Sequence, residues 1–199
     1  MSDLASTRAA RPWLATLSVG VVLLAVVGAA AVVVYGGLYN VAADVPHSQP
    51  VYWLLETARD RSIAVRAAGL VVPDDLADPQ RIASGAGQYA EMCSGCHLAP
   101  GMARTEMSRG LYPRAPELRR GSRADAAEDF WVVKHGIKAT GMPAWGVTHN
   151  DKLLWDVVAF LRKLPKLSPD EYQATVKSAP KSHDEMMEDM QMDGSHGGP

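Results

Sequence analysis

The longest feature in the pattern of apolar and polar positions is an uncharged run near the N-terminus. The 32 residues 12–43 carry no charge, and residues 13–35 alone would span about 35 Å as an α-helix. This length is enough to cross a bilayer. Because Arg8 and Arg11 precede the run, we expect residues 1–45 to form a short cytoplasmic stub and a transmembrane anchor, with the rest of the chain exported.

A cleaved signal peptide is the alternative for this segment. Val41, Ala42 and Ala43 are small residues of the kind that a signal peptidase accepts. The apolar run is longer than the core of a signal peptide, which has about 7–15 residues, so the sequence favours an uncleaved anchor. We therefore expect a single-pass protein of a bacterial inner membrane, with its main domain in the periplasm.

Residues 46–77 are expected to form a juxtamembrane helix and a linker. Residues 51–69 mix apolar and charged positions as a moderately amphipathic helix does. Such a helix could lie on lipid headgroups, dock on a membrane partner or act as a spacer with a solvated charged face. Residues 70–77, which contain Pro73 and two aspartates, are expected to link this helix to the next domain.

The apolar positions of residues 78–165 predict helices and no strand, which makes the expected fold class all-α. Each expected helix starts at a capping side chain; the expected caps are Asp78, Ser122 and Thr148. The first helix has proline at its first position and runs toward the cysteines, and Gly136 ends the second. The third covers residues 152–164 and ends at Pro165. One apolar face of this helix combines Leu154, Val157, Val158 and Leu161.

Residues 93–97 read Cys-Ser-Gly-Cys-His and have the spacing of a covalent haem attachment site. On one helical turn, the thiols of Cys93 and Cys96 can add to the two vinyl groups of a porphyrin, and His97 then points its imidazole at the iron. Bonding through Nε2 leaves Nδ1–H for a backbone carbonyl that orients the ring. Proline carbonyls in the following loop are the expected acceptors.

A dithiol redox motif and half of a zinc site are the alternatives for the two cysteines. A thioredoxin-like motif follows a strand within a βαβ unit, whereas residues 78–92 have helical character. The chain has only two cysteines, so no second pair completes a structural zinc site. One haem c is therefore the expected cofactor.

Met142 is the expected second axial ligand of the iron. A thioether is a soft ligand that favours ferrous iron. Most of the nine methionines in the chain are expected to fill the core or the tail, but Met142 lies between Gly141 and Pro143, in a loop that can be held rigidly against a flat cofactor. His135 and His149 are rival ligands, which we expect near helix ends instead.

With these motifs, residues 78–165 resemble a class I c-type cytochrome domain. Gly85 and Tyr89 match the positions at which the first helix of that family crosses the last, and Phe160 resembles their partner. Residues 116–118, Pro-Glu-Leu, resemble the segment whose proline carbonyl binds the proximal histidine, which implies that role for Pro116. Residues 141–145, Gly-Met-Pro-Ala-Trp, resemble the distal ligand segment of bacterial members. The resemblance implies an all-helical fold and a six-coordinate haem ligated by His97 and Met142.

Members of this family with a leading transmembrane helix carry electrons between respiratory complexes. The resemblance therefore implies an electron-transfer protein and no enzyme, with redox partner proteins and the membrane as partners. The donor would be a quinol-oxidising complex or a dehydrogenase, and the acceptor a terminal oxidase. A fixed subunit of a dehydrogenase or oxidase, and a haem enzyme or gas sensor with an open sixth position, are alternatives. Export disfavours nucleic-acid binding.

Charge is distributed unevenly along the exported part. Residues 78–165 contain 12 Lys and Arg against 9 Asp and Glu, whereas residues 166–199 contain 3 against 7. Six arginines could form a positive patch near the cofactor that attracts an acidic partner; they are Arg104, Arg109, Arg114, Arg119, Arg120 and Arg123. Ordinary solvated surface arginines are the alternative.

After a short capped segment at residues 168–171, the tail over residues 166–199 is expected to be disordered. It is acidic and rich in methionine and histidine. Clustered thioethers and imidazoles could bind Cu(I) and make the protein a copper-handling one; the candidate ligands are His183, Met186, Met187, Met190, Met192 and His196. A flexible acidic tail without metal explains the same composition.

Overall fold

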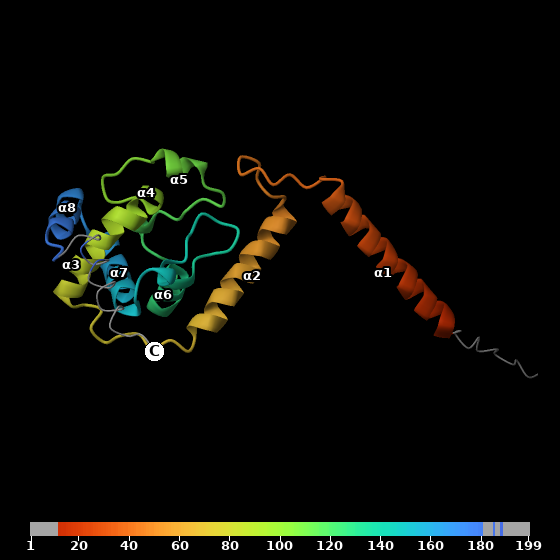
Figure 1. The fold of residues 1–199 in the computed structure, drawn as a ribbon, viewed down its shortest axis with the longest axis horizontal. Helices are drawn as coiled ribbons and strands as arrows, with labels where there is room; N and C mark the ends of the chain where they lie inside the picture. The colour runs from red at the N-terminus through yellow and green to blue at the C-terminus, as the bar shows by residue number, and fades with distance from the viewer. Residues whose placement is uncertain (1–11, 181–184, 186–187, 189–199) are drawn as a thin grey trace, which may run out of the picture. The chain divides into compact units, whose positions relative to one another are not determined.

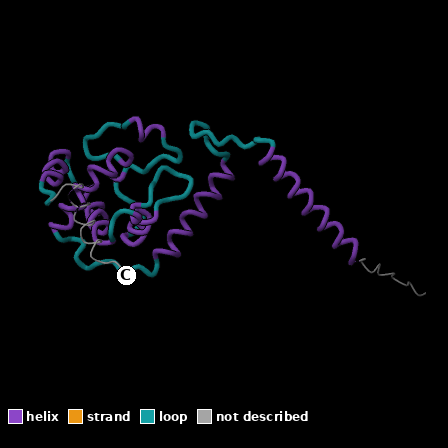
Figure 2. Tube along the Cα trace, in the orientation of Figure 1, coloured by secondary structure: helices purple, strands orange, loops and turns teal. Residues whose placement is uncertain are grey.

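The computed structural model describes residues 12–180 together with residues 185 and 188. In this part of the chain all regular structure is helical, which confirms the predicted all-α class (Figures 1 and 2). The α-helices are α1 (Pro12–Tyr35), α2 (Gln49–Ala67), α3 (Pro79–Gln88), α4 (Ser94–His97), α5 (Glu106–Gly110), α6 (Ala126–His135), α7 (Asp151–Lys163) and α8 (Pro169–Lys177). A π-helical turn covers Tyr89–Cys93, and 3-10 turns cover Leu118–Arg120, Trp145–Val147 and Leu164–Lys166. The predicted stub before Arg11 and the six predicted copper ligands lie outside the described residues.

The chain divides into two compact units, residues 1–45 and residues 46–199. The first contains α1, whose residues Thr16–Tyr35 form a helix long and apolar enough to cross a membrane. Almost all side chains of Thr16–Tyr35 are exposed; Leu24, for example, retains 75% of its accessible surface. An uncleaved anchor and a signal sequence share these properties.

α7 organises the core of the second unit because it buries side chains on two faces. One face contributes to a first cluster, formed by Ala86, Tyr89, Cys93, Ala99, Val157, Phe160, Leu161, Leu164 and Tyr172. The other face contributes to a second cluster, formed by Phe130, Val133, Leu154, Trp155 and Val158. The apolar face predicted for this helix is thus buried, and it joins α3 and α8 on one side to α6 on the other.

α3 and α7 cross at Gly85. A Cβ atom at this position would overlap the backbone carbonyl of Asp156 and lie 2.9 Å from the nitrogen of Val157. One turn after Gly85, at the start of the π-helical turn that follows α3, the ring of Tyr89 lies 5.3 Å from that of Phe160. The crossing therefore depends on a residue without a side chain, followed by an aromatic pair.

Two of the three predicted helix caps are wrong. Asp78 accepts hydrogen bonds from backbone N–H groups of the first turn of α3, as expected. The cap of α6, however, is Asp125, because Ser122 donates its hydroxyl to Asp129 at 2.6 Å. α7 is capped by Asn150, and the hydroxyl of Thr148 instead contacts the preceding 3-10 turn.

The packed unit extends beyond the predicted haem domain at both ends. Leu70 and Leu76, in the predicted linker, pack against the second cluster, and α2 contacts α6. On the C-terminal side, Ser168 forms a capping box at the start of α8, and Tyr172 is 5% exposed within the first cluster. The first part of the predicted tail, as far as the end of α8, is therefore helical and packed rather than disordered.

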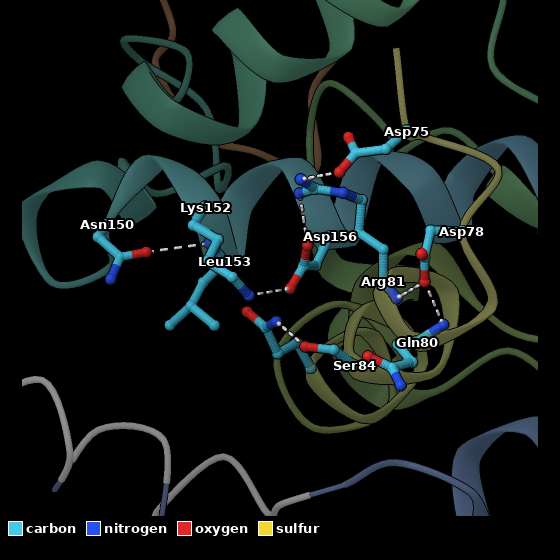
Figure 3. A network of polar contacts seen from close by, with 10 residues as sticks. Asp75, Asp78, Gln80, Arg81, Ser84, Asn150, Lys152, Leu153 and Asp156 are labelled. Atoms are coloured by element: carbon cyan, nitrogen blue, oxygen red, sulfur yellow. Dashed lines mark hydrogen bonds and ion pairs between the residues drawn. The ribbon is translucent and has the colours of Figure 1, made fainter. Parts of the chain in front are cut away.

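A polar network crosses the α3–α7 contact beside Gly85 (Figure 3). The carboxylate of Asp156, which is 1% exposed, accepts from Arg81 at 2.7 Å and from Lys152 at 3.4 Å. Arg81 also bonds Asp75 at 2.8 Å. Burial raises the pKa of Asp156 above its ordinary value, although Lys152, Ser84 and Arg81 act in the opposite direction. The pKa of Arg81 is also raised, mainly by its hydrogen bond to Asp75.

Asp156→Asn is expected to lower the free energy of unfolding by about 3 kcal/mol at neutral pH, because it removes the buried charge that faces the guanidinium of Arg81. Arg81 would then keep only the exposed carboxylate of Asp75 as its partner. Urea unfolding at neutral pH measures the difference, with the exposed Asp74→Asn as control, which should be as stable as the native protein. An Asp156→Asn variant as stable as the native protein would contradict the expectation.

Candidate haem site

The two cysteines lie on consecutive helical turns that leave α3. Cys93 ends the π-helical turn and is buried in the first cluster, and Cys96 is half-buried in α4. Both thiols are free. Burial raises the pKa of Cys93 to about 12 and also raises that of Cys96. Since a redox dithiol works through a thiolate of lowered pKa, these protonated thiols do not suit that chemistry.

The surroundings of the cysteines do not suit zinc either. In the described part of the chain, no group of three or more His, Cys, Asp or Glu side chains could hold a metal ion. The nearest polar partner of Cys96 is a thioether, because its Sγ lies 3.1 Å from Sδ of Met107 on α5. The two alternatives that the sequence left open for the cysteines are thus both disfavoured by the structure.

His97 follows the second cysteine and is held by the loop that comes after it. Its Nδ1 atom lies 2.9 Å from the carbonyl oxygen of Pro116, which is 19 residues further along the chain. Burial lowers the pKa of the imidazole, and the bond to Pro116 acts in the opposite direction. A neutral ring with its proton on Nδ1 donates to this carbonyl and leaves Nε2 as the donor atom for a metal.

Tyr89 holds the chain directly after His97, a role that was not predicted from the sequence. Its side chain is fully buried, and its hydroxyl donates to the carbonyl oxygen of Leu98 at 2.6 Å. Leu98 ends α4 with a φ of 62°, which turns the chain sharply after the histidine. The signal in the sequence is the hydroxyl itself, since a buried tyrosine normally finds a hydrogen-bond partner.

Met142 lies in a loop that returns to the end of α6. Gly136, the residue after α6, has a φ of 63°, and a Cβ atom there would lie 2.7 Å from the carbonyl oxygen of Met142. The same oxygen accepts from the N–H of Ile137 at 3.2 Å, and the N–H of Met142 donates to Thr140 at 3.1 Å. These contacts fix the backbone of Met142 in place.

The side chain of Met142 packs against the second cluster, in which Phe130 and Trp155 stack with ring centroids 4.0 Å apart. Cys93 belongs to the first cluster. Cys93 and Met142 therefore pack with different clusters, to which different faces of α7 contribute. The loop of Met142 also reaches the loop after the cysteine motif, because a Cβ atom on Gly141 would meet the side chain of Leu111.

The two rival histidines are engaged elsewhere. His149 is 6% exposed, and its Nδ1 atom contacts the hydroxyl of Thr148 at 2.8 Å, just before α7. His135 is the exposed last residue of α6, with its ring 4.9 Å from that of Trp131. Both lie at helix ends, as the sequence predicted.

Three of the six arginines of the predicted positive patch surround one carboxylate. Glu117 forms ion pairs with Arg104, Arg119 and Arg120. Arg109 donates to backbone carbonyls of its own segment. The patch is therefore a loop structure with an acidic centre rather than a uniform positive surface. This role of Glu117 was not predicted from the sequence.

The residues present fit a covalently bound haem. Two free thiols, an imidazole oriented by a carbonyl and a thioether in a fixed loop are the donor set that a c-type haem requires. In such a haem the imidazole and the thioether would ligate the iron, and the thiols would be the attachment points.

Comparison with known proteins agrees with this donor set. Residues 80–161 match the family model described as cytochrome C oxidase, cbb3-type, subunit III. The matched segment includes both cysteines, His97 and Met142. No curated protein and no solved structure matches the chain. The family match supports a c-type cytochrome, an electron-carrying haem protein that transfers electrons rather than catalysing a reaction on a substrate.

Proposed function

We propose that this c-type cytochrome is a membrane-tethered carrier of single electrons with one haem c. Cys93 and Cys96 hold the haem covalently, and His97 and Met142 ligate its iron. The donor is a quinol-oxidising complex or a dehydrogenase, and the acceptor is a terminal oxidase. α1 anchors the chain in a bacterial inner membrane, with the haem domain in the periplasm.

The contact between His97 and Pro116 is the observation that carries this proposal. An imidazole whose Nδ1 is committed to a carbonyl at 2.9 Å presents Nε2 in a fixed direction. A hydrogen bond of this kind makes the ring a stronger ligand and keeps it from rotating. When bound, the haem supplies a one-electron couple of the iron.

A fixed thioether on the other side favours transfer over catalysis. Catalysis and gas sensing need a vacant or easily displaced coordination position, whereas the backbone of Met142 is fixed through Gly136, Ile137 and Thr140. A carrier benefits from ligands that stay in place, because little rearrangement then accompanies the change of charge. The described contacts of Met142 thus favour the carrier over a haem enzyme or sensor.

Tethering would keep the haem domain near membrane partners. Residues Thr16–Tyr35 of α1 form a helix that is not buried in the protein and is long enough to cross a bilayer. A domain held at the membrane surface encounters other membrane complexes at a raised effective concentration. The exposed apolar side chains Trp53 and Leu54 on α2 are compatible with a position close to such complexes.

A fixed subunit of an oxidase is the second candidate function. The description of the matching family names a subunit of a cytochrome oxidase, and a haem of the same ligation would serve there. Purification in mild detergent separates the two candidates. A carrier is recovered mainly as a single chain, whereas a subunit is recovered in stoichiometric complex with other chains.

Optical and electron paramagnetic resonance spectra of the haem-loaded full chain test the proposed function. We expect a low-spin ferric haem with an iron–thioether charge-transfer band, and haem that stays attached after denaturation and acid extraction. A high-spin ferrous form that binds carbon monoxide readily would instead favour the enzyme or sensor. Haem released by extraction would contradict the role of the two cysteines.

A further inference from the structure

Glu117 lies next to the carbonyl of Pro116, which forms the hydrogen bond with His97. It is the residue directly after Pro116, and its side chain is 19% exposed. Its carboxylate lies 3.1 Å from Nη2 of Arg119, 3.0 Å from Nε of Arg120 and 3.6 Å from Nε of Arg104. The carboxylate of Glu117 thus forms ion pairs with three arginines, and the hydrogen bond from Arg119 and the charges of the guanidinium groups lower its pKa.

Arg119 connects this carboxylate to the other end of the loop. Its Nη2 donates to Glu117, and its Nη1 donates to the carbonyl oxygen of Met102 at 3.2 Å. Met102 and Leu118 both pack against the first cluster. A planar guanidinium with several donors can bridge two acceptors in this way, whereas an ammonium group is a single point of charge. Arg119 therefore ties residues 117–119 to residue 102 at the core.

The contacts of Glu117 with Arg104, Arg119 and Arg120 form a clamp, which acts on His97 through the peptide bond between Pro116 and Glu117. The carbonyl of Pro116 and the N–H of Glu117 belong to one planar peptide unit, so contacts that hold Glu117 in place restrain the direction of that carbonyl. Pro116 itself has no backbone N–H with which to hold the segment from the other side. The clamp on Glu117 is the observed restraint on the oxygen that accepts from His97.

We propose that Glu117 and Arg119 are positioning residues for His97. They hold the Pro116 carbonyl at hydrogen-bond distance and so set the orientation of the imidazole and its strength as a ligand. This inference rests on the proposed function, in which His97 ligates the iron. Isolated surface ion pairs contribute little, but here the shared carboxylate is largely covered and one arginine also bonds the backbone.

The test uses two variants of the haem-loaded protein, Glu117→Gln and Arg119→Lys. The second keeps the charge but cannot bridge Glu117 and Met102 together. We expect the Nδ1–H of His97 to exchange with solvent about tenfold faster in both variants than in the native protein. NMR of the ferric protein measures this exchange rate. The matched controls Glu106→Gln and Arg114→Lys make the same chemical changes at exposed positions between the cysteine motif and Pro116 and should leave the exchange rate unchanged.

Each outcome decides between the proposals. Faster exchange in both variants, with native rates in both controls, supports the positioning role, and the unchanged charge of Arg119→Lys excludes a purely electrostatic effect. A native low-spin spectrum with unchanged exchange in Glu117→Gln and Arg119→Lys overturns the positioning role alone. A native protein without a histidine-ligated haem overturns both this inference and the proposed function.

Discussion

Gly85→Ala is expected to lower the free energy of unfolding of the haem-loaded protein by about 2 kcal/mol. The added Cβ would overlap the backbone carbonyl of Asp156, and backbone cannot yield by a change of rotamer. Alanine is more favourable than glycine in a helix by about 1 kcal/mol. This gain in stability opposes the cost of separating α3 from α7. The clash is with main chain at the tightest contact of the core, and we expect the cost to exceed the gain.

Denaturant unfolding followed by circular dichroism measures this change. Gly69→Ala is the control, because a Cβ at Gly69 meets nothing within 4 Å. The control should be as stable as the native protein or slightly more stable. Equal stabilities of the two variants would show that the helices separate at little cost, and would contradict a tight crossing at this position.

The same crossing bears on the haem site because Tyr89 follows Gly85 by one turn. Tyr89 packs on Phe160 of α7, and its hydroxyl holds Leu98 directly after His97. A shift of α3 against α7 would therefore displace the segment that carries the histidine. Stability and ligand geometry depend on the same few contacts, so Gly85→Ala should also weaken haem retention.

The parts of the site that the sequence predicts are those encoded over a few neighbouring residues. The cysteine motif and the Met142 loop can be recognised because the chemistry needs those residue types at that spacing. The cap at Asp78 was predictable for the same reason. Ser122 and Thr148 were misassigned because each is followed by a second good cap, Asp125 or Asn150, and only packing decides which residue adopts the extended conformation.

The rest depends on residues that are distant along the chain. Arg81 forms an ion pair with Asp156, which is 75 residues further along the chain. No local sequence pattern predicts that pair. The packing of α8 was missed because a short capped segment with few apolar residues resembles a solvated tail. In the structure, Tyr172 and Val176 attach this segment to the first cluster. The arginines of the loop looked like a uniform patch because the ion pair of Glu117 with the distant Arg104 emerges only in three dimensions.

Met142→Ala is expected to abolish the iron–thioether charge-transfer band and to lower the reduction potential of the haem by about 0.2 V, a fraction of the range of about 0.8 V that axial ligands produce. A thioether stabilises ferrous iron, so its loss favours the ferric state. The backbone around residue 142 should persist, because Gly136 and Ile137 contact the main chain of this residue rather than its side chain. The effect should thus be confined to the coordination of the iron.

Met107→Ala is the matched control for this prediction. Met107 is another thioether close to the cysteine motif, 3.1 Å from Cys96, but it is 61% exposed and lies on the short helix α5. Optical spectra and redox titrations of the three proteins, under the same conditions, separate the two methionines. The band should survive in Met107→Ala with a potential close to the native value. If Met107→Ala loses the band and Met142→Ala keeps it, the second axial ligand is Met107, and the loop that Gly136 holds against α6 has a structural role instead.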